Sequence, residues 1–186
     1  MFTTTVGLIY QGQSGSPYSL VYSGDINGDN GTSNDLIFIP TDAQVDQMQF
    51  LGTDAYTAEQ QRANLKQWLA TTRYVKDHRG EYFERYGDNL PFESHFDFHF
   101  GQKFGIRTGK YVHALELTLD IMNVANLLNK DWGRTFSSGY NSEFVSPITY
   151  KGDGVFQFVN PSDMPLKYPS SYYSRWRGQV GLKYTF

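Results

Sequence analysis

The chain of 186 residues contains no cysteine, which excludes disulfides, thiolate metal sites and cysteine nucleophiles. It also has no excess of positive charge, since 16 Lys and Arg stand against 19 Asp and Glu, giving a net charge of −3. Nucleic-acid-binding proteins usually carry a basic patch, so we expect no nucleic-acid partner. No stretch approaches the roughly 18–20 apolar residues that a membrane-spanning helix needs.

Common enzyme motifs are missing as well. The sequence has no G-x-S-x-G, no H-E-x-x-H and no Gly-rich phosphate loop, so we expect neither enzymatic activity nor catalytic residues. Met1 leads directly into residues 2–6 (FTTTV), without a visible signal peptide. Because a secreted or outer-membrane protein needs one, the chain is interpreted as either a mature form or a piece of a longer protein, and we favour the piece.

Aromatic residues are abundant, and they occur in an alternating pattern. The 14 Tyr, 14 Phe and 3 Trp make up 17% of the chain. The pattern is clearest at residues 176–186, where every second residue is apolar, aromatic or Gly: Trp176, Gly178, Val180, Leu182, Tyr184 and Phe186. Successive side chains of a strand point to opposite faces, so this segment is predicted to be a strand with one apolar and one polar face.

The same alternation predicts five strands, at about residues 2–10, 18–25, 92–106, 110–124 and 174–186. Two long segments separate them, at about 26–91 and 125–173. The first of these segments contains a predicted helix from Ala58 to about Ala70. Thr57 and Gln60 form a capping box at its start.

These strands predict an all-β fold, namely a partial antiparallel transmembrane β-barrel of about five strands. Thirteen residues at about 3.3 Å each, tilted by about 40°, span roughly 33 Å, which exceeds the apolar band of an outer-membrane protein. The linkers alternate between short and long, which places both long loops on the extracellular side. A soluble β-sandwich also alternates, but its strands usually have about 5–6 residues.

A series of short motifs spans nearly the whole chain. In order, they are 24–29 (GDINGD), 34–40 (NDLIFIP), 79–80 (RG), Pro91 before the Phe-rich strand, 119–129 (LDIMNVANLLN), 131–133 (DWG) and 184–186 (YTF). Their order and spacing resemble the C-terminal end of a TonB-dependent outer-membrane transporter, most similar to the Oar-like branch near the SusC/RagA-type receptors.

The resemblance implies a β-barrel of about 22 strands, plugged by an N-terminal domain, that imports a peptide, glycan or chelate. It places the protein in the outer membrane of a Gram-negative bacterium. The implied partners are outer-membrane lipid, the rest of the barrel and its plug, the TonB complex through the missing N-terminal part, and the barrel-assembly machinery. The closing Tyr184 and Phe186 resemble the signal that this machinery recognises.

Oxygen-bearing side chains are closely spaced in residues 25–35. The candidate calcium ligands are Asp25, Asn27, Asp29, Asn34 and Asp35. Calcium prefers oxygen ligands at such alternate positions, but Leu36 stands where an EF-hand has its bidentate Glu. The alternative is a surface turn in which Asx side chains bond their own backbone. We expect no other cofactor.

Polar residues share one face of the two central predicted strands, namely His95, Asp97 and His99 on one strand and Glu116 and Asp120 on the other. They are interpreted as a polar barrel lining, with a metal site as the alternative. Arg175 and Arg177 are predicted to come near Asp120 and to form a salt-bridge ladder with it.

Aromatic residues of the second long segment suggest a binding surface, because exposed Tyr and Trp provide rigid amphipathic contact area. The candidate ligand-binding residues are Trp132, Tyr140, Tyr150 and Tyr172. They could equally pack the loops against each other. The alternative function is a soluble, calcium-dependent β-sheet binding module of a cell-surface protein, and an adhesin or secretion role is a third.

Overall fold

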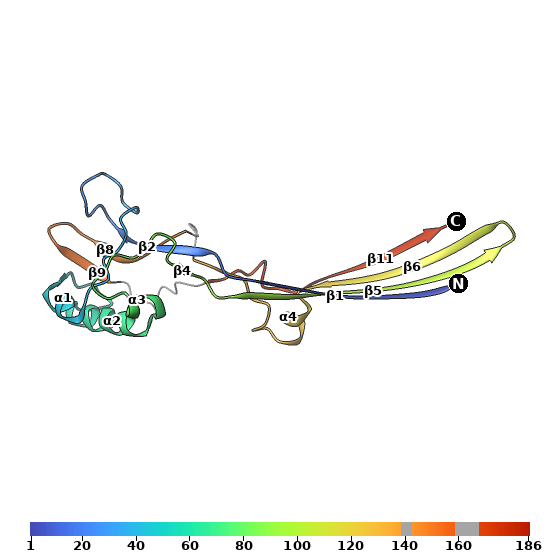
Figure 1. Cartoon of the computed structure of the whole chain (residues 1–186), viewed down its shortest axis with the longest axis horizontal. Helices are drawn as coiled ribbons and strands as arrows, with labels where there is room; N and C mark the ends of the chain where they lie inside the picture. The colour runs from blue at the N-terminus through green and yellow to red at the C-terminus, as the bar shows by residue number, and fades with distance from the viewer. Residues whose placement is uncertain (139–142, 159–167) are drawn as a thin grey trace. The chain divides into compact units, whose positions relative to one another are not determined.

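The computed structural model describes residues 1–138, 143–158 and 168–186. Within them the chain forms two compact units, each built from separate parts of the sequence (Figure 1). Unit 1 comprises Met1–Gly15, Pro91–Phe136 and Pro169–Phe186. Unit 2 comprises Ser16–Leu90 and Ser137–Tyr168.

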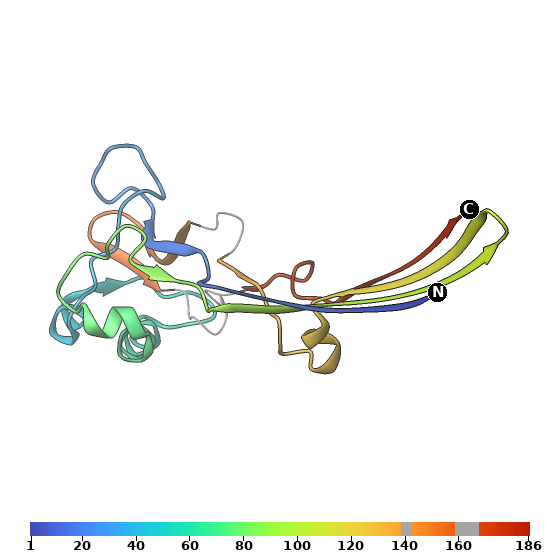
Figure 2. The same cartoon turned by 45° about the vertical axis from the view of Figure 1, so that its right-hand side comes forward.

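Unit 1 is built on a four-stranded antiparallel sheet in the order β1-β5-β6-β11. The strands are β1 (Phe2–Gln13), β5 (Glu93–Thr108), β6 (Tyr111–Met122) and β11 (Arg177–Thr185). They run side by side (Figures 1 and 2). Gly109, at φ +65°, lies in the tight turn between β5 and β6, a conformation that glycine adopts without steric cost.

Short elements follow the central hairpin of unit 1. Asn123 adopts a left-handed conformation at φ 54°, and the helix α4 (Val124–Leu128) begins directly after it. Further along, β7 (Phe136–Ser137) pairs with β10 (Tyr168–Pro169) in a two-stranded sheet.

Unit 2 contains a five-stranded mixed sheet in the order β3-β9-β8-β2-β4. Its strands are β2 (Pro17–Ser23), β3 (Gln49–Phe50), β4 (Asp88–Asn89), β8 (Phe144–Tyr150) and β9 (Val155–Phe158). The pairs β2–β8 and β3–β9 are parallel. Residues 18–22 of β2 are all buried, as is typical of a strand that is covered on both faces.

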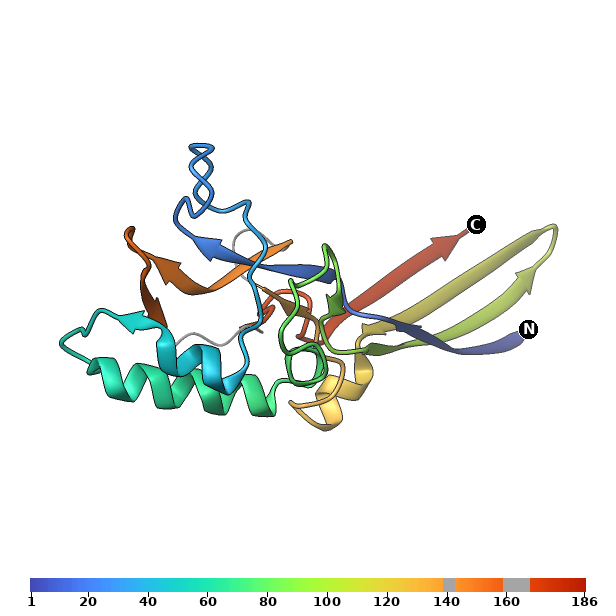
Figure 3. The same ribbon diagram turned by 60° about the vertical axis from the view of Figure 1, so that its left-hand side comes forward.

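Three helices complete unit 2: α1 (Asp42–Gln47), α2 (Ala58–Thr71) and α3 (Arg73–Asp77). The helix predicted from Ala58 is confirmed, with both capping-box bonds between Thr57 and Gln60 present. Figure 3 shows α1 and α2 along one side of the sheet. No helix of the described residues is long and apolar enough to cross a membrane.

The hydrophobic core of unit 2 gathers residues from its strands, helices and connecting segments. Its fully buried members include Leu20, Ile37, Ile39, Leu65, Leu69, Phe83 and Ile148. Burying a side chain of this size stabilises the fold by about 1.5–3 kcal/mol, before the entropy of ordering the chain is subtracted.

The prediction of an all-β, partial transmembrane β-barrel is wrong. The chain has a mixed α/β fold with two larger open sheets, one antiparallel and one mixed. Among the residues that the structure describes, β1 and β11 have no further neighbouring strand, so the sheet of unit 1 is open at both edges. Alternation identifies a two-faced strand, but it does not say how a sheet ends.

The predicted strand neighbours and loops also differ from the structure. The first two predicted strands were expected to be consecutive in one sheet, but β1 pairs with β5 and β2 belongs to unit 2. Residues 26–91, expected to be an extracellular loop, contribute helices, short strands and core residues to unit 2. Their buried side chains are scattered along the segment, and only the long-range packing brings them together.

Candidate functional site

The four-stranded sheet of unit 1 has one apolar face. Directly opposed residues of antiparallel strands share a face, so the pairing register places side chains in rows across the sheet. We call the following residues the apolar face: Phe2, Val6, Leu8, Tyr10, Phe96, Phe98, Phe100, Phe104, Ile106, Leu115, Leu117, Leu119, Ile121, Val180, Leu182 and Tyr184. Val180 and Leu182 are 76% and 69% exposed, so they lack the cover that a core strand has.

One polar pair interrupts the apolar face. The Thr4 hydroxyl donates to Oε1 of Gln102 at 2.7 Å, and Nε2 of Gln102 donates to the backbone oxygen of Thr3 at 2.9 Å. The two side chains thus bond within the sheet, which lowers the cost of removing them from water.

The opposite face is polar, and its rows carry most of the charge. Lys103, Glu116 and Lys183 lie opposite one another on β5, β6 and β11, so that unlike charges are neighbours. Two residues further along these strands, small residues take their place, with Gly101 opposite Thr118 and Thr118 opposite Gly181. We call this side of the sheet the polar face.

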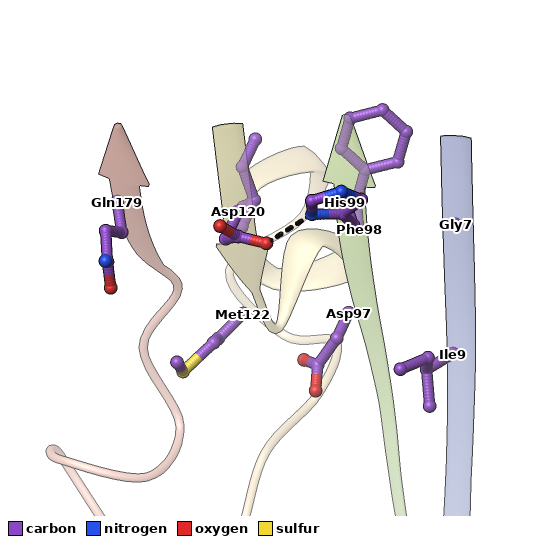
Figure 4. Close-up of a pocket in the computed structure, with 9 residues that line it drawn as sticks. Gly7, Ile9, Asp97, Phe98, His99, Asp120, Met122 and Gln179 are labelled. Atoms are coloured by element: carbon purple, nitrogen blue, oxygen red, sulfur yellow. Dashed lines mark hydrogen bonds and ion pairs between the residues drawn. The ribbon is translucent and has the colours of Figure 1, made fainter. Parts of the chain in front are cut away.

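A hollow of about 260 Å³ lies on the polar face (Figure 4). Its central row runs from Gly7 across His99 and Asp120 to Gln179. Because Gly7 has no side chain, the sheet backbone beside His99 is left uncovered. Ile9, Asp97 and Met122 line the hollow next to this row, and Figure 4 shows Asp97 between the other two.

His99 and Asp120 form the closest polar contact in the hollow. Nδ1 of His99 lies 2.6 Å from Oδ1 of Asp120, and both side chains are about two-fifths exposed. Oδ1 of Asp97 accepts the backbone N–H of Asn123 at 2.8 Å, which ties β5 to the end of β6. Each carboxylate therefore has one oxygen engaged by a neighbouring group.

The polar residues expected on the two central strands lie on one face, but not all of them meet. His99 contacts Asp120, whereas Glu116 lies opposite Lys103. The predicted salt bridges from Arg175 and Arg177 to Asp120 are wrong, because Gln179 is the residue opposite Asp120. Arg177 instead donates to the Tyr172 hydroxyl at 2.9 Å and lies over the Tyr172 ring.

A second polar cluster surrounds a buried carboxylate at the start of β5. The side chain of Glu93 is 8% exposed, and its Oε2 accepts from Nε2 of Gln13 and the hydroxyl of Thr135, both at 3.3 Å. Nε2 of His95 lies 3.2 Å from the same Thr135 hydroxyl. Sequence reasoning missed this cluster, since Thr135 is about 40 residues away from both partners.

The predicted calcium loop folds around its own polar groups. Asp25 accepts three backbone N–H groups, those of Gly28, Asp29 and Asn30, at 2.6–3.2 Å. Oδ1 of Asp35 accepts from Nδ2 of Asn27 at 2.5 Å.

Asp29 belongs to the same network of bonds. The backbone N–H of Gly31 lowers the pKa of Asp29, and the Asn27 and Asn34 amides lower it further.

A metal site is not apparent from the geometry alone. Across residues 1–138, 143–158 and 168–186, no three or more His, Asp or Glu side chains are grouped to hold a metal ion. The bonds within residues 25–35 are those of an Asx-rich turn, in which carboxylates accept backbone N–H groups. Calcium binding by Asp25, Asn27, Asp29, Asn34 and Asp35 stays a prediction.

The predicted ligand-binding aromatics are divided between the units. Trp132 and Tyr172 belong to unit 1 and are exposed, and Tyr172 packs edge-on against Tyr173 at 5.0 Å. Tyr150 belongs to unit 2, where it is half-buried against Phe156 at 5.5 Å. Tyr140 lies outside the described residues. Ligand binding by these aromatics stays a prediction.

Tyr184 and Phe186, the predicted assembly signal, stack on each other at 5.9 Å between ring centroids. The Tyr184 hydroxyl lies 2.7 Å from Nδ1 of His113 on the neighbouring strand. Phe186 is 85% exposed. Both aromatic rings are therefore accessible, and their recognition by the assembly machinery stays a prediction.

A scan against protein-family models and searches of the curated proteins and of the solved structures found no match to the chain.

Proposed function

We propose that this chain is part of a TonB-dependent outer-membrane transporter that imports a peptide, glycan or chelate, and that the sheet of unit 1 presents its apolar face to membrane lipid. One observation carries the proposal. Apart from Thr4 and Gln102, this face is apolar across all four strands, yet its edge-strand residues Val6 and Val180 are 65% and 76% exposed. Exposed apolar patches of this extent typically mark a protein or membrane contact.

The length of the apolar face fits a bilayer. On β5 the apolar face runs from Phe96 to Ile106, which is 11 residues counted inclusively, and Gln102 is the polar residue among its alternate positions. A tilted strand needs about 9–11 residues to cross the hydrocarbon core. The face is therefore long enough to meet lipid over the full thickness of that core.

Aromatic pairs lie near both ends of this face. Phe2 packs edge-on against Phe104 at 5.1 Å near one end, and Tyr10 packs against Phe96 at 4.9 Å near the other. Amphipathic rings such as Tyr favour the boundary between headgroups and acyl chains.

The free edges of β1 and β11 set a condition on the proposal. Unpaired backbone N–H and C=O groups are costly in hydrocarbon, so both edges need pairing partners from outside the chain. The resemblance to TonB-dependent transporters is the support for uptake rather than another membrane role.

Cysteine labelling can test the lipid contact, because the chain has no Cys and every introduced one is unique. We would place a polarity-sensitive fluorophore on four single-Cys variants of the full chain, at Leu117 and Leu119 on the apolar face and at Glu116 and Thr118 on the polar face. Each variant would be added to phosphatidylcholine–phosphatidylglycerol vesicles with brominated acyl chains.

The expected result is a blue shift and bromine quenching at positions 117 and 119, with neither effect at positions 116 and 118. Equal behaviour of all four labels would contradict a lipid-facing side of the sheet. The calcium-dependent binding module would be favoured instead if the chain does not bind vesicles, stays monomeric without detergent and is stabilised by calcium.

A further inference from the structure

The hollow on the polar face has a lining that selects for a particular ligand chemistry. We propose that it binds an organic cation, a primary ammonium or guanidinium group on a short apolar stem. This site is independent of the membrane proposal, because it lies on the opposite face of the sheet from the residues expected to meet lipid.

The charge of the hollow comes from Asp97 and Asp120. Oδ1 of each carboxylate is engaged, by the Asn123 backbone and by His99 respectively. In the described part of the chain no hydrogen bond reaches either Oδ2 atom. Asp97 stands diagonally across the strand pair from Asp120, where Cα atoms are about 7–8 Å apart. A cation between the two carboxylates would contact both free oxygens.

The shape of the hollow favours a carbon stem over a bare metal ion. Its volume of about 260 Å³ is comparable to the volume that about eight to nine water molecules occupy in liquid water, at roughly 30 Å³ each. This is too much space for one metal ion. Ile9 and Met122 offer an aliphatic chain and a polarizable thioether as walls. The uncovered backbone beside Gly7 forms the floor.

Other charged groups of the polar face do not line the hollow. On β1 the polar-face residues Thr3, Thr5, Gly7, Ile9 and Gln11 carry no charge. Lys103, Glu116 and Lys183 form a row four residues away from the central row of the hollow. Arg177 lies opposite Met122 and donates to the Tyr172 hydroxyl, so the charged residues that line the hollow besides His99 are Asp97 and Asp120.

The test uses the full chain in zwitterionic micelles and four small probes of matched size: butylammonium, butylguanidinium, butyrate and butanol. Binding would be followed by ligand-detected NMR, and circular dichroism would check that each variant folds. We expect the two cations to bind, with at least tenfold weaker binding of butyrate and butanol. Equal binding of all four probes would overturn the charge argument.

Variants locate the site. Asp97→Asn and Asp120→Asn are each expected to weaken cation binding at least fivefold. The control Glu116→Gln, on the same face but outside the hollow, should change it less than twofold. Unchanged binding in both Asp variants would place the cation elsewhere and refute the proposal.

Discussion

Gln61 is a buried amide that joins three parts of unit 2, and its replacement gives a sharp test of the packing. It is 1% exposed and lies on the same side of α2 as Leu65. Its Nε2 donates to the backbone oxygens of Leu51 and Tyr56, at 2.7 and 3.3 Å. Its Oε1 accepts the backbone N–H of Phe158 at 3.0 Å. We expect Gln61→Leu to lower the free energy of unfolding of unit 2 by about 2 kcal/mol.

The expected loss of stability depends on which hydrogen bonds the partner groups of Gln61 retain in the variant. The Leu51 oxygen retains a bond from the Gln157 amide at 3.4 Å, and the Tyr56 oxygen retains the Thr53 N–H at 2.8 Å. The Phe158 N–H, in contrast, loses its only acceptor among the described residues. An unpaired buried donor costs about 1–3 kcal/mol, and this term dominates because Leu occupies a similar volume to Gln.

Urea unfolding monitored by tryptophan fluorescence can measure this loss. Trp68 lies on α2, is 4% exposed, and packs against the Phe158 ring at 5.7 Å, so it reports on the affected region. Trp132 and Trp176, both in unit 1, would be replaced by Phe in the reference protein. Gln67→Leu, at an exposed position of α2, is the control and should stay within about 0.5 kcal/mol. If Gln61→Leu lowered the free energy of unfolding no more than that control, the hydrogen bond to Phe158 would not contribute measurably to the stability of unit 2.

Three further predictions concern pH, backbone conformation and calcium. Burial, followed by the hydrogen bond to Asp88, raises the pKa of Tyr18, so its stabilisation is complete below about pH 10, the ordinary tyrosine value, and is lost as the pH rises further. Tyr18→Phe should therefore flatten the alkaline decline in melting temperature, and an unchanged slope would contradict this assignment. Gly133, at φ +60°, faces the Asn123 side-chain oxygen so closely that an added Cβ would overlap it. Gly133→Ala should destabilise unit 1 by about 2 kcal/mol or more in urea unfolding, and an unaffected midpoint would refute the close approach. Calcium at millimolar concentration should raise the melting temperature if residues 25–35 bind it. An unchanged melting temperature would indicate that these residues form an Asx-rich turn that does not bind calcium.

Sequence reasoning located the strands of unit 1 more successfully than their assembly. The alternation at residues 92–106 and 110–124 covers most of β5 and β6, because each strand has one apolar and one polar side. The same local pattern cannot specify which strand lies next to which. Pairing of β1 with β5 depends on residues about 90 positions apart. The expected pairing of the first two predicted strands was wrong for this reason.

Unit 2 was harder to predict because its signals are not periodic. The capping box of Thr57 and Gln60 revealed α2, since capping is a local interaction. The buried Gln61 occupies the position four residues before Leu65, where a periodic pattern calls for an apolar residue. Its partners Leu51 and Phe158 come from distant parts of the sequence, so the sequence alone offered no reason for a buried amide there.

The polar hollow was predictable in part. Alternation placed His99 and Asp120 on the same side of neighbouring strands, and they do form a bond. The roles of Gly7 and Gln179 depend on the register of the outer strands, which a shift of one residue would reverse. The hollow exists because a glycine in β1 lies opposite a histidine, and no local motif marks that coincidence.

The register of unit 1 also has a consequence for the order in which its sheet forms. Only a tight turn separates β5 from β6, whereas Phe2 of β1 must find Phe104 across the whole of residues 16–90 of unit 2. Closing a short loop costs less entropy and takes less time than closing a long one. The β5–β6 hairpin is therefore expected to nucleate this sheet, with β1 and β11 adding later to its two sides. During that interval both edges of the hairpin are unprotected, and this is when misfolding by incorrect strand pairing would be most frequent.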